Sequence, residues 1–139
     1  MIALLLLCVL VMPAVADTIN VLDHAALLSM GEELKLQAKI QTIVDTYAMD
    51  VVILTELGIG YKSPGLYAAD AFDEMGCGVG ANRDGMLFLL DLNGRNYFTA
   101  THGKAIHIFS DYGLDRLHDQ VVSYLSDGEY YKAFDRYLQ

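Results

Sequence analysis

The fold is decided by residues 50–101, which contain two apolar runs and a turn. The runs are residues 51–55 (VVILT), which Asp50 precedes, and residues 86–90 (MLFLL). Their length and their β-branched and apolar side chains are typical of strands that are buried on both faces. Asn93-Gly94 then precedes a third strand-like run, residues 97–101 (YFTAT). An Asn-Gly pair between two such runs predicts an antiparallel hairpin.

A helix is predicted between the first two strands. Ser63-Pro64 is a suitable start, because proline is tolerated at the first helical position. Its inner face should comprise Ala68, Ala71, Phe72 and Met75. A strand–helix–strand passage of this kind predicts a right-handed parallel crossover, and the hairpin makes the sheet mixed.

Three further helices are predicted outside this central region. Ser29 and Glu32 form a capping box, and helical spacing then gives one apolar face: Leu36, Ile40, Ile43, Val44, Tyr47. Asp111 is predicted to cap the next helix, which Gly128 ends, and a short helix closes the chain. The inner positions of these two helices are Leu114, Leu117, Val121, Leu125, Tyr130, Tyr131, Phe134 and Leu138. The predicted fold class is α/β, a compact three-layer α/β/α sandwich around a small mixed sheet, Rossmann-like in arrangement.

The first sixteen residues have the pattern of a secretory signal peptide. Residues 2–12 (IALLLLCVLVM) are apolar, Pro13 follows, and Ala14-Val15-Ala16 precede Asp17. A short apolar core before small residues that are two apart predicts cleavage after Ala16. The run is shorter than the ~20 residues that a membrane-spanning helix needs. A buried N-terminal strand is the alternative. We therefore expect a signal peptide at residues 1–16, one domain at residues 17–139, and an extracytoplasmic location.

The charge of the chain narrows the choice of partners. The net charge is −9, and no charged residue lies in the first sixteen, so the whole charge belongs to residues 17–139. Such a surface repels nucleic acid and anionic lipid headgroups, and it attracts cations. Cys77 is the one cysteine in this part of the chain, so an internal disulfide is excluded there. Its glycine-rich surroundings predict an exposed thiol that reacts in the native state, with a buried core position as the alternative.

Several common catalytic motifs are missing from the sequence. Glycines 76, 78 and 80 follow a predicted helix and precede a strand, which is the reverse of the dinucleotide-binding order. There is no G-x-S-x-G, H-E-x-x-H or C-x-x-C. The four histidines are scattered, which argues against a zinc site.

The carboxylates are the more informative set. Asp70 lies in an acidic cluster of the second predicted helix, Asp84 precedes a strand, Asp23 precedes the first capping box, and Asp111 begins a row of acids spaced four apart. Oxygen ligands from several segments suit calcium or magnesium. The alternative is that these acids are solvated helix faces of an acidic protein.

A series of motifs in the chain resembles the TPM domain, which is named for its thylakoid-lumen, photosystem-repair and receptor-modulator members. The motifs lie, in order, at residues 21–29, 50–55, 67–73, 76–78, 82–90, 109–111 and 127–134. They cover essentially residues 19–138. The likeness is greatest to exported TPM domains of Gram-positive anaerobes, which usually carry a membrane helix behind the domain. The resemblance thus implies that a C-terminal membrane anchor is missing from this chain.

The resemblance also implies a function. The fold of the family is an α/β/α sandwich, some members bind calcium or magnesium in an acidic pocket, and others assist membrane complexes. The acids that match the family's motifs are Asp23, Asp84 and Asp111, followed by Asp70. We therefore expect a non-catalytic, extracytoplasmic module that binds a divalent cation and assists a membrane-protein partner. A metal-assisted acid phosphatase, proposed for a plant relative, is the alternative.

Overall fold

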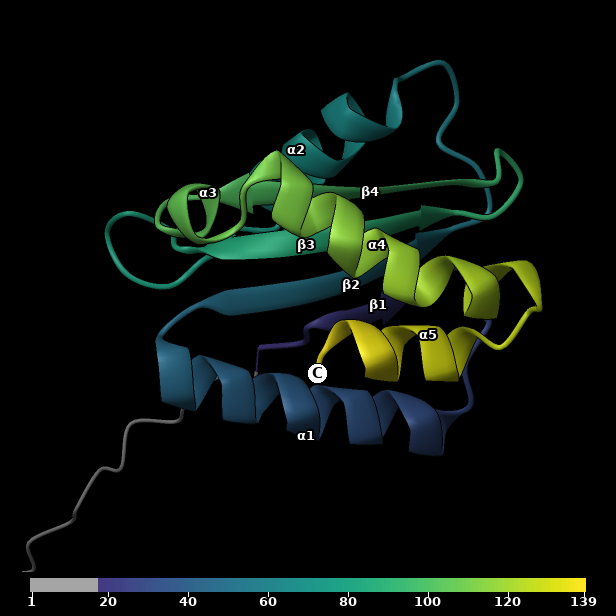
Figure 1. The fold of residues 1–139 in the computed structure, drawn as a ribbon, viewed down its shortest axis with the longest axis horizontal. Coiled ribbons are helices and arrows are strands. Elements are labelled where there is room, and N and C mark those ends of the chain that lie inside the picture. The colour runs from purple at the N-terminus through teal and green to yellow at the C-terminus, as the bar shows by residue number, and fades with distance from the viewer. Residues whose placement is uncertain (1–17) are drawn as a thin grey trace, which may run out of the picture.

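The computed structural model describes residues 18–139 (Figure 1). The predicted signal peptide and its alternative therefore lie outside the described residues. The strands are β1 (Val21–Asp23), β2 (Asp50–Glu56), β3 (Gly85–Asp91) and β4 (Asn96–His102). The helices are α1 (Met30–Tyr47), α2 (Pro64–Glu74), α3 (Ala105–Ile108), α4 (Asp111–Ser126) and α5 (Tyr130–Tyr137). None of these helices is long and apolar enough to cross a membrane.

One mixed sheet with the strand order β1-β2-β3-β4 forms the middle layer. β1, β2 and β3 are parallel, and β4 is antiparallel to β3, which confirms the predicted hairpin. The hairpin loop comprises residues 92–95, and Arg95, at φ 53°, rather than Gly94 adopts the left-handed conformation in it. β1 was not expected from the sequence, because three residues are too few to show a strand pattern.

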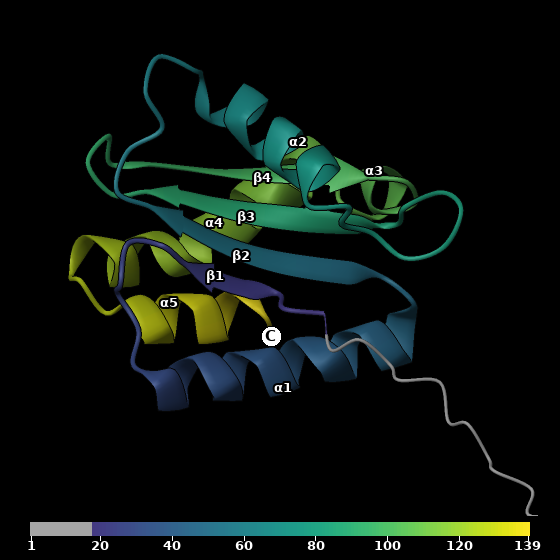
Figure 2. The same cartoon turned by 180° about the vertical axis from the view of Figure 1, so that it is seen from behind.

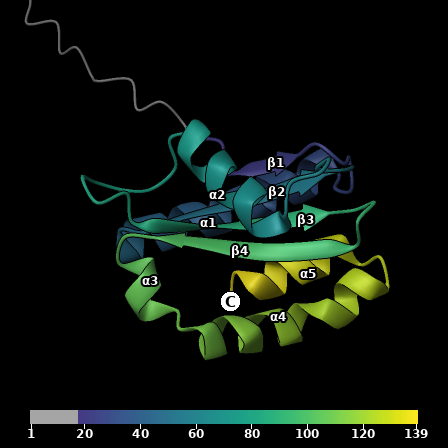
Figure 3. The same cartoon turned by 90° about the horizontal axis from the view of Figure 1, so that it is seen from above.

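Helices cover both faces of the sheet, as the predicted sandwich requires. The apolar side chains of α2 pack on one face, beside Val52 and Leu87, and those of α1, α4 and α5 pack on the other, beside Ile53 and Phe88. Figure 3 shows α2 on one side of β4 and α4 and α5 on the opposite side.

The two parallel crossovers have opposite hands. Both move one strand along the sheet in the same direction, but α1 and α2 lie on opposite faces. The β2–α2–β3 crossover is right-handed, as predicted, so the β1–α1–β2 crossover has the rare left hand (Figures 1 and 2). The loops that leave β1 and β2 therefore diverge toward opposite faces of the sheet.

The predicted helix starts are mostly confirmed. Ser29 and Glu32 form the reciprocal capping box of α1, and Ser63 caps α2 with Pro64 in its first turn. Asp111 is not a cap, contrary to our prediction. The Ser110 hydroxyl accepts the Gly113 N–H at 3.2 Å, and Asp111 is the first residue inside α4, where its charge faces the positive end of the helix dipole.

Two predicted core positions are wrong. Met75 follows the last residue of α2 and is 39% exposed, and Tyr47 ends α1 and is 63% exposed. The other predicted inner residues of α1, which include Leu36 and Ile40, do pack into the core.

Candidate functional site

The divergence of the loops after β1 and β2 identifies the first place to look for a site. In open α/β sheets, ligands bind in the crevice outside the carboxyl ends of adjacent strands whose connections leave toward opposite faces. In this chain, β1 ends at Asp23 and is followed by His24, and β2 ends with Thr55 and Glu56.

Asp23 fixes the turn from β1 into α1. Its Oδ1 accepts a hydrogen bond from the Thr55 hydroxyl at 2.5 Å, and its Oδ2 accepts one from the Leu28 N–H at 2.8 Å. The same Thr55 hydroxyl accepts the N–H of Ala25 at 3.1 Å. Each oxygen of Asp23 therefore has one protein partner, and each retains further lone-pair capacity.

Glu56 lies beside Asp23 but belongs to the other face. Asp23 is in register with Thr55, and side chains alternate along a strand, so Asp23 and Glu56 leave toward opposite faces and flank the crevice. The Glu56 Oε1 is 2.8 Å from the His24 Nδ1, with the two side chains 17% and 55% exposed. Burial raises the pKa of Tyr67 on α2, and the charge of Glu56 raises it further. Sequence reasoning missed Glu56, although it directly follows a predicted strand.

Asp84 and Asp111 lie at the opposite end of the sheet from Asp23. Asp84 precedes β3, and Gly85 is in register with Asp50, whereas Asp23 is in register with Thr55. Five residues of β2 separate these positions, which corresponds to roughly 16 Å. The Oδ1 of Asp84 accepts the backbone N–H of Lys104 at 2.7 Å. Asp70 is elsewhere again, on α2, in an ion pair with Lys62 at 2.8 Å.

The four predicted metal ligands are thus distributed over three places rather than converging. Within residues 18–139 no three His, Cys, Asp or Glu side chains are already grouped as a metal cage. A cation would therefore need water molecules to complete its coordination, which is usual for magnesium.

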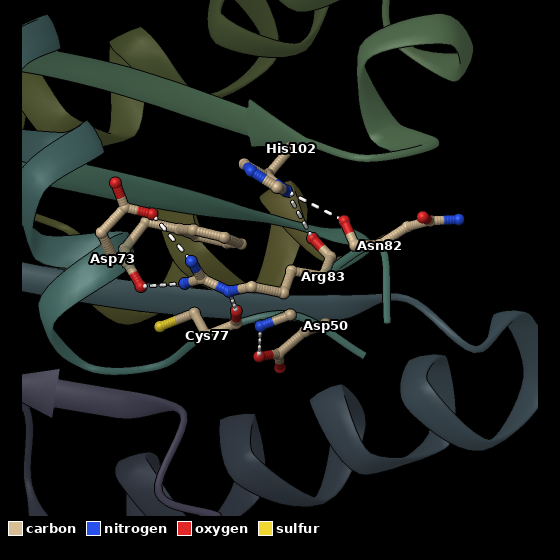
Figure 4. Close-up of polar contacts among 8 residues, drawn as sticks. Asp50, Asp73, Cys77, Asn82, Arg83 and His102 are labelled. Carbon is tan, nitrogen blue, oxygen red and sulfur yellow. Dashed lines mark hydrogen bonds and ion pairs between the residues drawn. The ribbon is translucent and has the colours of Figure 1, made fainter. Parts of the chain in front are cut away.

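The amino end of β3 has a dense polar network, shown in Figure 4. Arg83 donates from Nε to the carbonyl of Cys77 and from Nη2 to that of Phe72, both at 3.0 Å, and pairs with Asp73 at 2.9 Å. The Nδ1–H of His102 donates to the carbonyls of Asn82 and Arg83 at 3.1 and 2.9 Å. These bonds close the loop of residues 75–84 over the sheet.

Of two groups that could serve in catalysis, Cys77 is buried and His118 is half-buried. Cys77 is 7% exposed and packs with the core beside α2, so the expectation of an exposed thiol is wrong. Burial, and next the charge of Asp50, raise the pKa of Cys77 to about 11, which keeps it protonated and unreactive. Burial lowers the pKa of His118, whose Nε2 lies 2.8 Å from the Thr99 hydroxyl. Both residues are part of the packing.

Comparison with known proteins places the chain among its relatives. A family model described as the TPM domain matches residues 21–139. The chain is 30% identical over 123 residues to the UPF0603 protein YdjH of Bacillus subtilis, a match that covers 86% of this chain and 45% of that protein. The chain therefore spans about half the length of this curated relative.

Solved structures show the same fold. The N-terminal domain of a protein from P. gingivalis superimposes with a TM-score of 0.77 at 24% identity, covering 88% of this chain and 80% of that one. The N-terminal domain of cg2496 from Corynebacterium glutamicum gives 0.68 at 17% identity, with 86% and 74% covered. The BA42 protein of Bizionia argentinensis gives 0.68 at 14%, with 80% and 76% covered.

Proposed function

Since this chain belongs to the TPM domain family, we propose that it is a non-catalytic module that binds a divalent cation, calcium or magnesium. The proposed site is the crevice at the carboxyl ends of β1 and β2. One observation carries the proposal: Asp23 and Glu56 flank the point at which α1 and α2 diverge to opposite faces of the sheet.

The chemistry of the crevice suits a hard cation that keeps part of its water shell. Asp23 and Glu56 supply carboxylate oxygens, and magnesium is commonly held by one or two carboxylates together with waters. The net charge of −9 concentrates cations near the surface. Binding requires Glu56 to exchange its contact with the partly exposed His24, a pair that contributes little to stability.

A role in binding rather than catalysis is supported by the state of the reactive side chains. Cys77 is buried, His118 is half-buried against the core, and His102 uses its Nδ1–H to hold the loop of residues 75–84. The alternative function, a metal-assisted acid phosphatase, would place phosphate oxygens on the same cation. Hydrolysis of p-nitrophenyl phosphate by the chain, lost in Glu56→Gln, would establish catalysis in place of a binding role.

An NMR titration with calcium and with magnesium tests the site. We expect saturable shifts at residues 23–28 and 55–57, and a melting temperature that rises with cation concentration, because a ligand of the native state stabilises it by mass action. Glu56→Gln and Asp23→Asn should reduce both effects. Asp70→Asn, on α2, is the matched control and should leave them unchanged.

Two results would overturn this assignment. Shifts centred on Asp84 and Asp111, abolished by Asp84→Asn and retained in Glu56→Gln, would move the cation to the opposite end of the sheet. An unchanged spectrum and melting curve with both metals would remove the cation altogether.

The proposal also includes export and a membrane-protein partner. It is supported by the signal-like pattern of residues 1–16 and by the acidic charge of the remaining chain. In a secreting host, the intact mass of the exported chain should correspond to a start at Asp17. Recovery of a chain that still begins at Met1 from the exported fraction would contradict this part.

A further inference from the structure

An apolar groove lies at the other end of the molecule from the proposed cation site. It has a volume of about 390 Å³. Its lining includes Met49 from the loop between α1 and β2, Val51 from β2, Met86 from β3 and Leu117 from α4. Gln139 also lines it. α5 lies between α1 and α4 (Figure 1), and Tyr137, its last residue, lines the groove as well.

The mouth of the groove is apolar as well. Tyr47 from α1 and Ile108 from α3 both line it and are 63% and 60% exposed. Large side chains of this kind are usually covered when they adjoin the core. Their exposure extends the apolar lining outward to solvent, as a site for an elongated apolar ligand requires.

The charge of the groove is opposite to that of the protein. Lys104 is the one charged side chain among the described residues that line it, and no carboxylate side chain is among them. The Lys104 Nζ donates to the carbonyl of Tyr47 at 2.6 Å, which holds the ammonium at the mouth and satisfies the last turn of α1. An ammonium has three donors, so two remain for a ligand. The nearby Asp84 carboxylate bonds to the backbone N–H of Lys104 and not to its side chain.

The size and lining of the groove suit a small ligand with an apolar body. A single hydrocarbon chain fits, and small-molecule sites begin near 300 Å³. We propose that the groove binds an anionic amphiphile, a linear hydrocarbon chain with a carboxylate head. The chain lies over Met49, Val51 and Met86, and the carboxylate accepts hydrogen bonds from Lys104.

The methionines of the chain allow the site to be located. Met49 and Met86 line the groove, whereas Met30 and Met75 are 79% and 39% exposed on other parts of the surface. In a chain with ¹³C-labelled methionine methyl groups, titration with octanoate should shift Met49 and Met86 to saturation and leave Met30 and Met75 in place. Decanoate should bind on the order of tenfold more tightly, because each additional buried methylene contributes ~0.8 kcal/mol.

The role of Lys104 is tested with a neutral ligand and two variants. 1-Octanol has the same chain length without the charge, so it should bind the wild type more weakly than octanoate does. Lys104→Gln should weaken octanoate about tenfold, as expected for the loss of a charge-assisted hydrogen bond, and leave octanol unchanged. Lys104→Arg should retain the preference for the carboxylate. Melting curves of both variants test whether the loss of the Lys104 hydrogen bond to Tyr47 destabilises the last turn of α1.

Three outcomes would overturn the proposal. The first is equal shifts at all four methionines, which indicate non-specific association. The second is an octanoate-to-octanol preference that is the same in Lys104→Gln as in the wild type. The third is that the Met49 and Met86 signals do not shift with either ligand but do shift with protein concentration. The groove would then be an interface between copies of the chain. Cation binding at Glu56 is unaffected by any of these results.

Discussion

The two ends of the sheet are both rich in polar side chains, but they use them differently. At the amino end of β2 and β3, Asp50, Arg83 and His102 bond to backbone groups and hold loops in place. At the carboxyl end of β1 and β2, Asp23 and Thr55 also hold a turn. His24 and Glu56, in contrast, bond to each other, and His24 is 55% exposed.

This difference shows that the number of polar residues is a poor guide to function. The motif at residues 82–90 attracts attention in the sequence because of its asparagine, arginine and aspartate. In the structure, the side chains of Arg83 and Asp84 supply hydrogen bonds to backbone groups of a loop that lacks regular structure. Side chains that the fold does not need are the ones available to a ligand. The following predictions test which side chains hold the fold and which are free to bind.

The largest effect is expected at Gly78, in the loop of residues 75–84. Its φ is +100°, and an added Cβ would lie 2.5 Å from the backbone of Arg83. Gly78→Ala should therefore destabilise the domain by about 4 kcal/mol, since both strain and overlap contribute. Gly76→Ala is the control: its φ is +65° with nothing within 4 Å, and the expected cost is about 1 kcal/mol. Equal urea midpoints for the two variants would show that the loop is not rigidly held.

Asp50 should have the next largest effect. It is 6% exposed, its Oδ2 accepts the N–H of Gly78 at 2.8 Å, and its Oδ1 accepts the side-chain amide of Asn20. Asp50→Ala leaves both donors unpaired and should cost about 3 kcal/mol in a denaturant titration. Asp73→Ala, which removes a 65% exposed partner of Arg83 in the same network, should cost less than about 1 kcal/mol.

We expect the pH dependence of stability to arise at His118, which packs against the middle of the sheet, and not at either end. His118 lies against Phe88 and Tyr97, and Thr99 bonds to both His118 and Tyr137. Burial lowers the pKa of His118, and the charges of Asp115 and Asp119 oppose this shift. The unfolded chain therefore takes up a proton that the folded chain resists, and stability falls as the pH drops below about 6.5.

His118→Gln should flatten this dependence between pH 7.5 and pH 5, as urea midpoints at a series of pH values would show. A dependence that persists in His118→Gln but disappears in His24→Gln would instead assign the titration to the carboxyl end of the sheet.

The smallest effect on stability is expected at Glu56. Its contact is with the partly exposed His24, and such pairs contribute less than about 1 kcal/mol. Glu56→Gln should therefore melt almost as the wild type does without metal, but lose most of the rise in melting temperature with magnesium or calcium. A large loss of stability in the metal-free variant would place Glu56 with the structural residues.

The sequence predicted the regular elements well where they carry a local signal. The capping box at Ser29, the Ser63-Pro64 start and the buried runs at residues 51–55 and 86–90 are all confirmed. β1 and α3 were missed because three and four residues are too short for a period to be visible. The family likeness identified from the motifs is confirmed over residues 21–139.

The sequence by itself determined the α/β class, the hairpin and the family, because hydrophobic period and turn chemistry are local properties. Only the tertiary structure decided which acids lie together. It separated Asp23 from Asp84 by the length of β2 and brought Glu56 next to the crevice. It also buried Cys77 and left Tyr47 exposed beside an unfilled groove. Those outcomes depend on the face on which each helix packs, and this in turn depends on contacts between distant segments.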